Sequence, residues 1–290
     1  METVLSPKDR ATARRAIEHH YDVGNEFYAL WLDAGMSYSC AMWPEEQHDI
    51  DLDSAQLRKL DYHLAESKAL SAERILDIGC GWGAMLQRLR QRSEVLTHAA
   101  GLTLSAEQAA HVTRLGLASV EVAIENWLDH RPAKPYDAMI SIGAFEHFAT
   151  PQDTLTQKRQ KYRQFFEFAR DNLSKRGRLS LQTIAYLNLD RSQASEFMEQ
   201  EIFPNADLPT LGDIVEAASG VLEIVRVRND RLDYARTCDL WARRLKANRE
   251  RAVELVGQAT VKKYERYLQL SSLGFFMEKI CLLRLTMQRS

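Results

Sequence analysis

The residues most able to do chemistry surround a short glycine-rich segment. LDIGCGWG (76–83) holds Asp77, followed by Gly79, Gly81 and Gly83. Glycines let the backbone turn sharply and lie close to a ligand, and the start of the helix that follows offers free N–H groups. The spacing differs from the GxGxxG of dinucleotide binders. Because a carboxylate would repel phosphate but suits a zwitterion, the segment predicts a site for S-adenosylmethionine; the alternative is a tight turn without a ligand.

Polar groups for a ribose follow the next expected strand. That strand ends in GLTLS (101–105), without the acidic residue that many nucleotide-binding folds of this kind use to hold ribose hydroxyls. Thr103 and Gln108 are the available substitutes.

A carboxyl group and its neighbour form the candidate catalytic pair. Glu146 lies just beyond another expected strand, and a desolvated pocket would raise its pKa into the range of a useful general base. The alternative is a carboxylate that only organises the loop. His147 either bonds the cofactor or packs structurally.

Three further candidates each have a structural alternative. Cys40 is either part of the site or a small buried apolar residue, as most free cysteines are, and we assign it no nucleophilic role. Tyr234 is either a site residue or a core residue. Glu278 is a speculative second base, or a solvated end of a helix or strand.

Short apolar runs alternate with helical segments in the elements that must position these residues. The expected strands are residues 74–79, 98–102, 120–124, 136–142, 177–184, 221–227 and 279–287, and the expected helices are residues 11–21, 52–70, 83–91, 106–115 and 158–173. In the second of these helices Leu57, Leu60 and Leu64 recur at helical spacing. Repeated βα units predict an α/β fold whose parallel sheet is covered on both faces.

The expected organisation is a single domain with two additions to its core. Residues 1–70 form an N-terminal helical cap, residues 71–184 the cofactor-binding core, residues 185–220 a substrate lid after the fifth strand, and residues 221–290 the rest of the core. Segments at these positions commonly cover the carboxyl ends of the strands, where ligands bind in such sheets.

Composition excludes several classes of protein. The 290 residues carry 38 basic and 40 acidic side chains, which leaves no basic footprint for nucleic acid. No apolar run approaches the length of a membrane span, and residues 1–10 contain no secretory signal, so we expect a cytoplasmic protein without integral membrane contact. The four cysteines are too far apart for a zinc or redox pair, and we expect no metal.

Several stretches resemble the cyclopropane fatty acid synthases and mycolic acid cyclopropane synthases. They are HYDVGNEFY (20–28), MSYSCAMW (36–43), LDIGCGWG (76–83), GLTLSAEQ (101–108), SIGAFEHF (141–148), IFPNADLP (202–209) and YARTCDLW (234–241). SIGAFEHF and YSCA are the most specific. The resemblance implies a Rossmann-like class I methyltransferase with a seven-stranded, mostly parallel sheet and helices on both faces. Plant alkaloid N-methyltransferases share some of these cofactor-binding motifs, so the resemblance defines the fold and the cofactor better than the substrate.

The resemblance also implies which residues contact S-adenosylmethionine. Tyr38 and Ser39 would touch the cofactor, and Asp77, Gly79 and Gly81 would cradle its methionine end. The other implied contacts are Thr103, Leu104 and Gln108 at the ribose, Ile124, Glu125, Asn126 and Trp127 near the adenine, and Ser141.

A bound bicarbonate that serves as general base is a further implication of the resemblance. Its ligands would be Cys40, Glu146, Tyr234 and a histidine on the fifth strand, where this chain has Gln182. A glutamine cannot carry a proton, which questions the use of bicarbonate here. Glu278 and Arg284 replace a small residue and a glutamine of the family. With a lid poor in basic residues, these departures favour a changed substrate, such as a specialised metabolite.

The implied reaction is methylation at carbon. An alkene or electron-rich ring carbon would attack the sulfonium methyl, and aromatic rings would steady the resulting cation. The candidates are Tyr21, Phe27, Tyr38, Phe145 and Tyr234. Removal of a proton would give a cyclopropane or a methylated product on an unsaturated small molecule or acyl chain. The alternatives are an N- or O-methyltransferase, and a cofactor-binding subunit that is inactive without a partner enzyme. Whether the chain forms a homodimer stays open.

Overall fold

The computed structural model describes residues 23–46, 49–189 and 207–290, and these build a seven-stranded sheet in the order β3-β2-β1-β4-β5-β7-β6. The strands are β1 (Arg74–Ile78), β2 (His98–Thr103), β3 (Val120–Ile124), β4 (Tyr136–Ile142), β5 (Leu173–Tyr186), β6 (Glu223–Asn229) and β7 (Ile280–Gln288). β1 to β5 pair in parallel, whereas β7 runs antiparallel between β5 and β6. The predicted mostly parallel α/β sheet is therefore confirmed.

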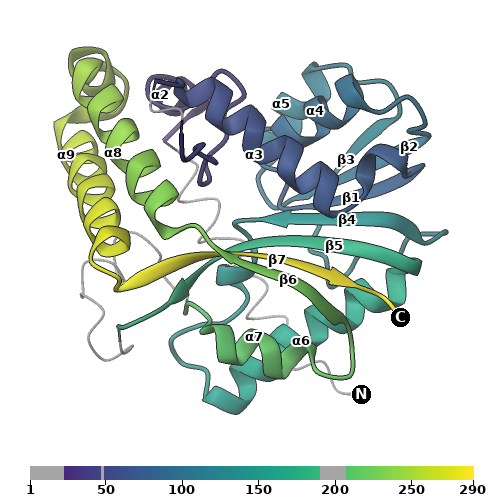
Figure 1. Ribbon diagram of the computed structural model, residues 1–290. Coiled ribbons are helices and arrows are strands. Elements are labelled where there is room, and N and C mark those ends of the chain that lie inside the picture. Colours follow the sequence, from purple (N-terminus) through teal and green to yellow (C-terminus); the bar gives the residue numbers. More distant parts are fainter. Residues whose placement is uncertain (1–22, 47–48, 190–206) are drawn as a thin grey trace.

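Helices cover both faces of this sheet and one end of it (Figure 1). On one face lie α3 (Leu52–Glu66), α4 (Ala84–Arg92) and α5 (Ala106–Arg114), and on the other lie α6 (Leu155–Asn172) and α7 (Leu211–Ala218). The helices α2 (Asn25–Ala29), α8 (Arg231–Ala247) and α9 (Arg249–Phe276) stand at the end where β7 begins. Because β7 is antiparallel, that is the end at which the parallel strands finish and at which ligands bind in such sheets.

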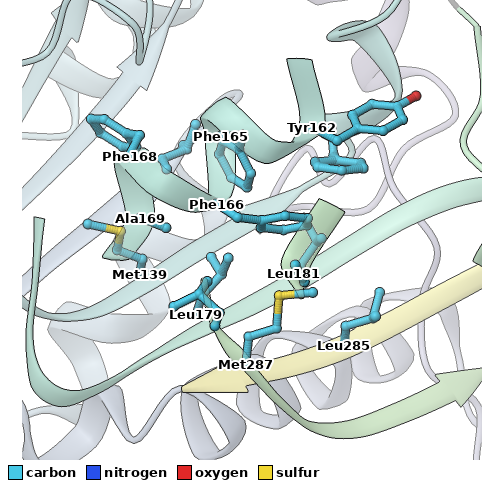
Figure 2. Close-up of a cluster of buried hydrophobic side chains, with 14 of the residues drawn as sticks. Met139, Tyr162, Phe165, Phe166, Phe168, Ala169, Leu179, Leu181, Leu285 and Met287 are labelled. Carbon is cyan, nitrogen blue, oxygen red and sulfur yellow. The ribbon is translucent and has the colours of Figure 1, made fainter. Parts of the chain in front are cut away.

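The core under α6 is mainly aromatic (Figure 2). Phe165 and Phe166 of α6 are fully buried and pack toward Leu179 and Leu181 of β5. A capping box between Thr154 and Gln157 satisfies the free N–H groups at the start of α6 and fixes where it begins. α6 also buries the polar side chains of Lys158, Lys161 and Tyr162, and each of them is bonded to Asp207 or Asp153. This face is therefore a packed support.

The face of α3 that packs on the sheet is more polar than the sequence pattern suggests. Leu60 and Leu64 are buried as expected, but Leu57 is 44% exposed. The buried side instead carries Gln56, Lys59 and His63, which are spaced as helical neighbours one turn apart. Because burying polar side chains is costly, their presence on the buried side of α3 indicates that this helix also positions polar groups.

An aromatic cluster joins the N-terminal part of the described chain to its C-terminal helices. Phe27, Tyr28 and Trp31 pack around Tyr264 of α9, and Trp31 also contacts Trp241 of α8. α9 is kinked at Gly257, whose φ of 79° a residue with a side chain rarely adopts. In the ranges that the structure covers, none of the helices has both the length and the apolar surface needed to cross a membrane.

Candidate functional site

The glycine-rich segment forms a tight turn between β1 and α4. Gly79, Gly81 and Gly83 all have positive φ, at 81°, 55° and 83°. A Cβ at Gly79 would lie 2.8 Å from the Cβ of Ala144, and one at Gly83 would lie 2.9 Å from Val112. A Cβ at Gly81 would meet nothing within 4 Å. Packing therefore requires two of the glycines, and the third borders open space where a ligand can approach the backbone.

Asp77 lies at the carboxyl end of β1 directly before this turn. It is 2% exposed, and its Oδ2 has no hydrogen-bond partner in the described part of the chain. Burial raises the pKa of Asp77 to about 7, and the nearby charge of Lys59 opposes that rise. A buried carboxylate oxygen without a donor is costly, so this group fits a ligand that brings a positive charge.

The residues implied for the ribose lie beside that turn. Thr103 Oγ1 donates to Gln108 Oε1 at 2.7 Å, and the Thr103 hydroxyl accepts from the Ser105 N–H. Thr103 and Gln108 are both buried. The amide nitrogen of Gln108 is thereby left as a donor for a hydroxyl, and Leu104 lies between the two polar side chains in the chain.

The residues implied for the adenine separate into two groups. Ile124 is largely exposed at the end of β3, and the Glu125 N–H donates to the Thr103 carbonyl, so both are adjacent to the ribose residues. Asn126 caps its own turn by accepting from the Leu128 N–H. Trp127 packs its ring into the core against phenylalanines, which are Phe148, Phe165 and Phe168. The structure thus places the Trp127 ring in the aromatic core between the loop after β3 and α6.

The loop that carries Tyr38, Ser39 and Cys40 is held by α3. Gln56 Nε2 donates to the carbonyls of Ser37 and Ser39, and Lys59 Nζ donates to Ser39 Oγ at 3.0 Å. The Tyr38 ring packs on Tyr28, Trp31 and Trp241. These contacts fix the loop over the carboxyl ends of the strands.

Glu146 occupies a short 3-10 helix, η2 (Phe145–His147), after β4. The side chain is buried, and its Oε2 accepts from Thr183 Oγ1 at 3.0 Å. Burial raises the pKa of Glu146 to about 7, although its own backbone N–H, Thr183 and the backbone of Ile184 oppose the rise. A carboxyl group poised near neutral pH is what a general base requires.

Tyr234 and Cys40 are both held in their protonated forms. Burial raises the pKa of Tyr234 well above its usual value, and the charges of Cys238 and Tyr267, followed by those of Cys40 and Glu146, add to this rise. Burial also raises the pKa of Cys40 to about 12, and its Sγ donates to the Ala41 carbonyl. Cys40 is therefore a thiol and not a nucleophile at neutral pH.

The two neighbours of Glu146 differ in their surroundings. Phe145 is fully buried and stacks on Tyr162 at 4.4 Å between ring centroids, which makes it a core residue. Burial lowers the pKa of His147 to about 4, so its imidazole is neutral at pH 7. Phe27 likewise lies wholly within the aromatic cluster.

Gln182 is held in one orientation by a buried arginine. Arg284 Nε donates to Gln182 Oε1 at 2.8 Å, and since a guanidinium can only donate, the oxygen of the amide must face it. His63 Nε2 lies 3.2 Å from the same oxygen and must donate to it, while His63 Nδ1 accepts from Ser180. Burial, with the charges of Arg284 and Lys59, lowers the pKa of His63 well below its usual value. The histidine is neutral.

Arg284 itself is completely buried and links three parts of the chain. It pairs with Asp230 and donates to the carbonyls of Cys40 and Ala41 at 3.3 and 3.1 Å. Gln182 is thus fixed as an acceptor of hydrogen bonds on this side and has no titratable proton. It does not fit the role of a proton-carrying ligand of bicarbonate.

Three candidates remain, and they are Glu278, Ser141 and Tyr21. Glu278 is half-exposed in the turn before β7 and pairs with Arg231 at 2.7 Å, so the structure does not bring it to Glu146. Ser141 Oγ donates to the Ile78 carbonyl and ties β4 to β1. Tyr21 lies outside the described residues.

The structure therefore brings the residues expected at the methionine and ribose ends of the cofactor together around the turn at residues 79–83, and it places Glu146 beside Thr183. It also adds polar residues that the sequence pattern did not indicate. The additions are Gln56, Lys59, His63, Thr183 and Asp230. Their signal in the sequence was weak, because a polar side chain is normally assigned to the exposed side of a helix.

This geometry was compared with known proteins. The family described as Mycolic acid cyclopropane synthetase matches residues 8–285. "Cyclopropane mycolic acid synthase 3" of Mycobacterium tuberculosis is 34% identical over 270 residues, which cover 87% of this chain and 89% of that protein. "S-adenosylmethionine-dependent methyltransferase UmaA" of the same organism is 35% identical over 269 residues, covering 86% and 88%.

A solved structure agrees in fold over nearly the whole chain. The crystal structure of mycolic acid cyclopropane synthase CmaA1 complexed with SAH and CTAB superimposes with a TM-score of 0.85 and 32% sequence identity. The match covers 95% of this chain and 98% of that one.

Proposed function

Because the chain belongs to the mycolic acid cyclopropane synthetase family and is an S-adenosylmethionine-dependent methyltransferase, we propose that it methylates carbon, or forms a cyclopropane, on an unsaturated small molecule or acyl chain. The observation that carries this proposal is Glu146, a buried carboxyl group with a pKa of about 7 whose Oε2 accepts from Thr183 Oγ1. Transfer to nitrogen or oxygen needs no base for a carbon-bound proton, whereas this reaction does.

The cofactor supplies an electrophilic methyl group, and the residues described here bind and orient it. Asp77 and the turn at residues 79–83 face its amino-acid end, and Thr103 with Gln108 faces its ribose. Alignment and exclusion of water do most of the catalytic work in such a transfer. The rings of Tyr38 and Tyr234 are aromatic groups that can steady a developing cation.

Glu146 then takes the proton that the substrate must lose. S-adenosylmethionine, when bound, would supply the methyl group: its carbon–sulfur bond would break with the electron pair left on sulfur as the substrate double bond forms the new carbon–carbon bond. The neighbouring carbon of the substrate would then be cationic. Glu146 removes a proton from the new methyl group to close a ring, or from an adjacent carbon to restore a double bond. The Thr183 hydroxyl, which donates to Oε2, keeps the carboxylate aimed and partly charged before transfer.

Bicarbonate has no step in this proposal. Its expected histidine ligand is replaced by Gln182, whose oxygen is held by Arg284 and His63. The proton is assigned to Glu146 directly.

The test is Glu146→Gln in the purified chain, given labelled S-adenosylmethionine and a panel of unsaturated acyl chains and unsaturated small molecules. We expect the single-turnover rate to fall by about 10²- to 10⁴-fold, with affinity for S-adenosylhomocysteine unchanged. The matched control is Glu278→Gln, which alters an exposed carboxylate paired with Arg231 and should keep the wild-type rate.

Other outcomes would replace the proposal. A Glu146→Gln variant that keeps most of its rate on an amine or hydroxyl acceptor would identify an N- or O-methyltransferase. Transfer that occurs only after a second protein is added would identify a partner-dependent subunit. Both carbon reactions add the mass of one CH₂ unit to the substrate, and NMR distinguishes them. A methylated product keeps a double bond, whereas a cyclopropane product has a three-membered ring in its place.

A further inference from the structure

Lys59 is a buried ammonium group without a direct counter-charge. It is 2% exposed, and its Nζ forms one hydrogen bond in the described part of the chain, to Ser39 Oγ at 3.0 Å. The two other buried lysines of this part differ, because Lys158 pairs with Asp207 at 2.9 Å and Lys161 with Asp153 at 2.8 Å. A buried charge that lacks a partner is strongly destabilising, so the exception needs an explanation.

Asp77 is the complementary exception. Its Oδ2 is buried without a donor, and the charges of Asp77 and Lys59 are close enough for each to favour the ionised form of the other. Asp33 has a larger favourable effect on the charge of Lys59 than Asp77 has, but its carboxylate accepts from the N–H groups of Gly35 and Ser37 and forms no ion pair with Lys59 within 4 Å among the described residues. One positive and one negative group therefore remain unpaired beside the glycine turn.

Ser39 is the hydrogen-bond partner of Lys59. An ammonium can only donate, so Ser39 Oγ accepts from Lys59 and keeps its own hydrogen for another acceptor. A hydroxyl that accepts from a cation becomes a stronger donor. Gln56 holds the Ser39 carbonyl at 2.9 Å and fixes the position of this hydroxyl.

We propose that Lys59 is the counter-charge for the α-carboxylate of S-adenosylmethionine, acting through Ser39 Oγ, while Asp77 receives the α-ammonium. The arrangement matches a zwitterion, with a donor backed by a positive charge at one end and a bare carboxylate oxygen at the other. The inference rests on the proposed function only in placing the cofactor's amino-acid end beside the glycine turn.

The experiment varies protein and ligand together. Calorimetry measures the affinity of the wild-type chain and of Lys59→Met for S-adenosylhomocysteine and for its decarboxylated analogue, which keeps the ammonium group. We expect the wild-type chain to bind S-adenosylhomocysteine about 10- to 100-fold more tightly than the analogue, and Lys59→Met to bind the two within about threefold of each other. Lys161→Met, which removes another buried ammonium, should discriminate as the wild-type chain does.

Equal discrimination by Lys59→Met and the wild-type chain would overturn the inference. Should Lys59→Met not fold, Ser39→Ala replaces it, because that change removes the hydroxyl and leaves the lysine in place. Ser39→Ala is expected to lose most of the discrimination, and full discrimination by it would also overturn the inference. A wild-type chain that binds neither ligand would instead contradict the cofactor assignment itself, which is a separate result.

Discussion

The Glu146 carboxyl is buried against Thr183, and burial raises its pKa to about 7. A base must be ionised before it acts, so the single-turnover rate should rise with pH and level off above about 7. Glu146→Gln should abolish this ascending limb as well as lowering the rate. The measurement is the rate between pH 5.5 and 9 for both proteins. If the rate of the variant still rises with pH in the same way, the rise reports the ionisation of another group, such as Asp77.

The same burial has a thermodynamic cost. Because the pKa of Glu146 is raised in the folded chain, the folded state binds a proton that the unfolded state has released between about pH 4.5 and 7. The free energy of unfolding must therefore fall as pH rises through this window. Glu146→Gln should stabilise the ligand-free protein at pH 8 by about 1–3 kcal/mol, measured by denaturant unfolding. At pH 4 that gain should vanish, and a gain of equal size there would refute the linkage.

Single residues show where sequence reasoning succeeds and where it fails. The positions of Asp77, Glu146 and the glycines follow from strand ends, which apolar runs mark well. The orientation of Trp127 does not follow, since its ring packs against phenylalanines that come from distant positions in the chain. The locked amide of Gln182 is equally invisible, because it depends on a cation about one hundred residues away.

Among the elements, β7 is connected to the site by Arg284. This side chain joins β7 to the loop at residues 40–41 and to Asp230, which precedes α8. Arg284→Met would remove the buried partner of Asp230, which keeps only its pair with the more exposed Arg228, and it would remove the guanidinium donors to the carbonyls of Cys40 and Ala41. We therefore expect a loss of about 3–5 kcal/mol in the free energy of unfolding. Arg243→Met breaks only an exposed pair with Asp239 and should cost less than about 1 kcal/mol. If the two changes lowered the free energy of unfolding equally, burial would not be the reason that the Arg284 contacts stabilise the fold.

Strands were easier to predict than helices for a physical reason. The apolar runs of buried parallel strands are short and continuous, so most predicted strands agree with the structure within about two residues at each end. β5 is longer, beginning at Leu173. α7, α8 and α9 were not predicted, since they follow no βα alternation and α9 contains a glycine kink. The polar stripe on α3 was missed because Lys59 and His63 are buried against the usual preference of charged side chains.

At the scale of the whole molecule, the aromatic cluster makes distant parts of the chain unfold together. Phe27 is fully buried, and its ring lies 5.0 Å from that of Tyr264. We expect Phe27→Ala to lower the free energy of unfolding by about 3–5 kcal/mol, with one transition seen by both tryptophan fluorescence and far-ultraviolet circular dichroism. Phe276→Ala, at a position 67% exposed, should change it by less than about 0.5 kcal/mol. Two separate transitions would show that the helices α8 and α9 unfold on their own.

The antiparallel strand β7 has a consequence for how quickly the molecule can assemble. Tyr186 of β5 pairs with Ile280 of β7, 94 positions further along the chain. Closing so long a loop is slow relative to forming local contacts. Until β7 arrives, β5 is a long apolar edge whose unpaired N–H and C=O groups invite pairing with a second chain. Refolding should therefore give the most native protein at high dilution, with the yield lost to aggregates as concentration rises.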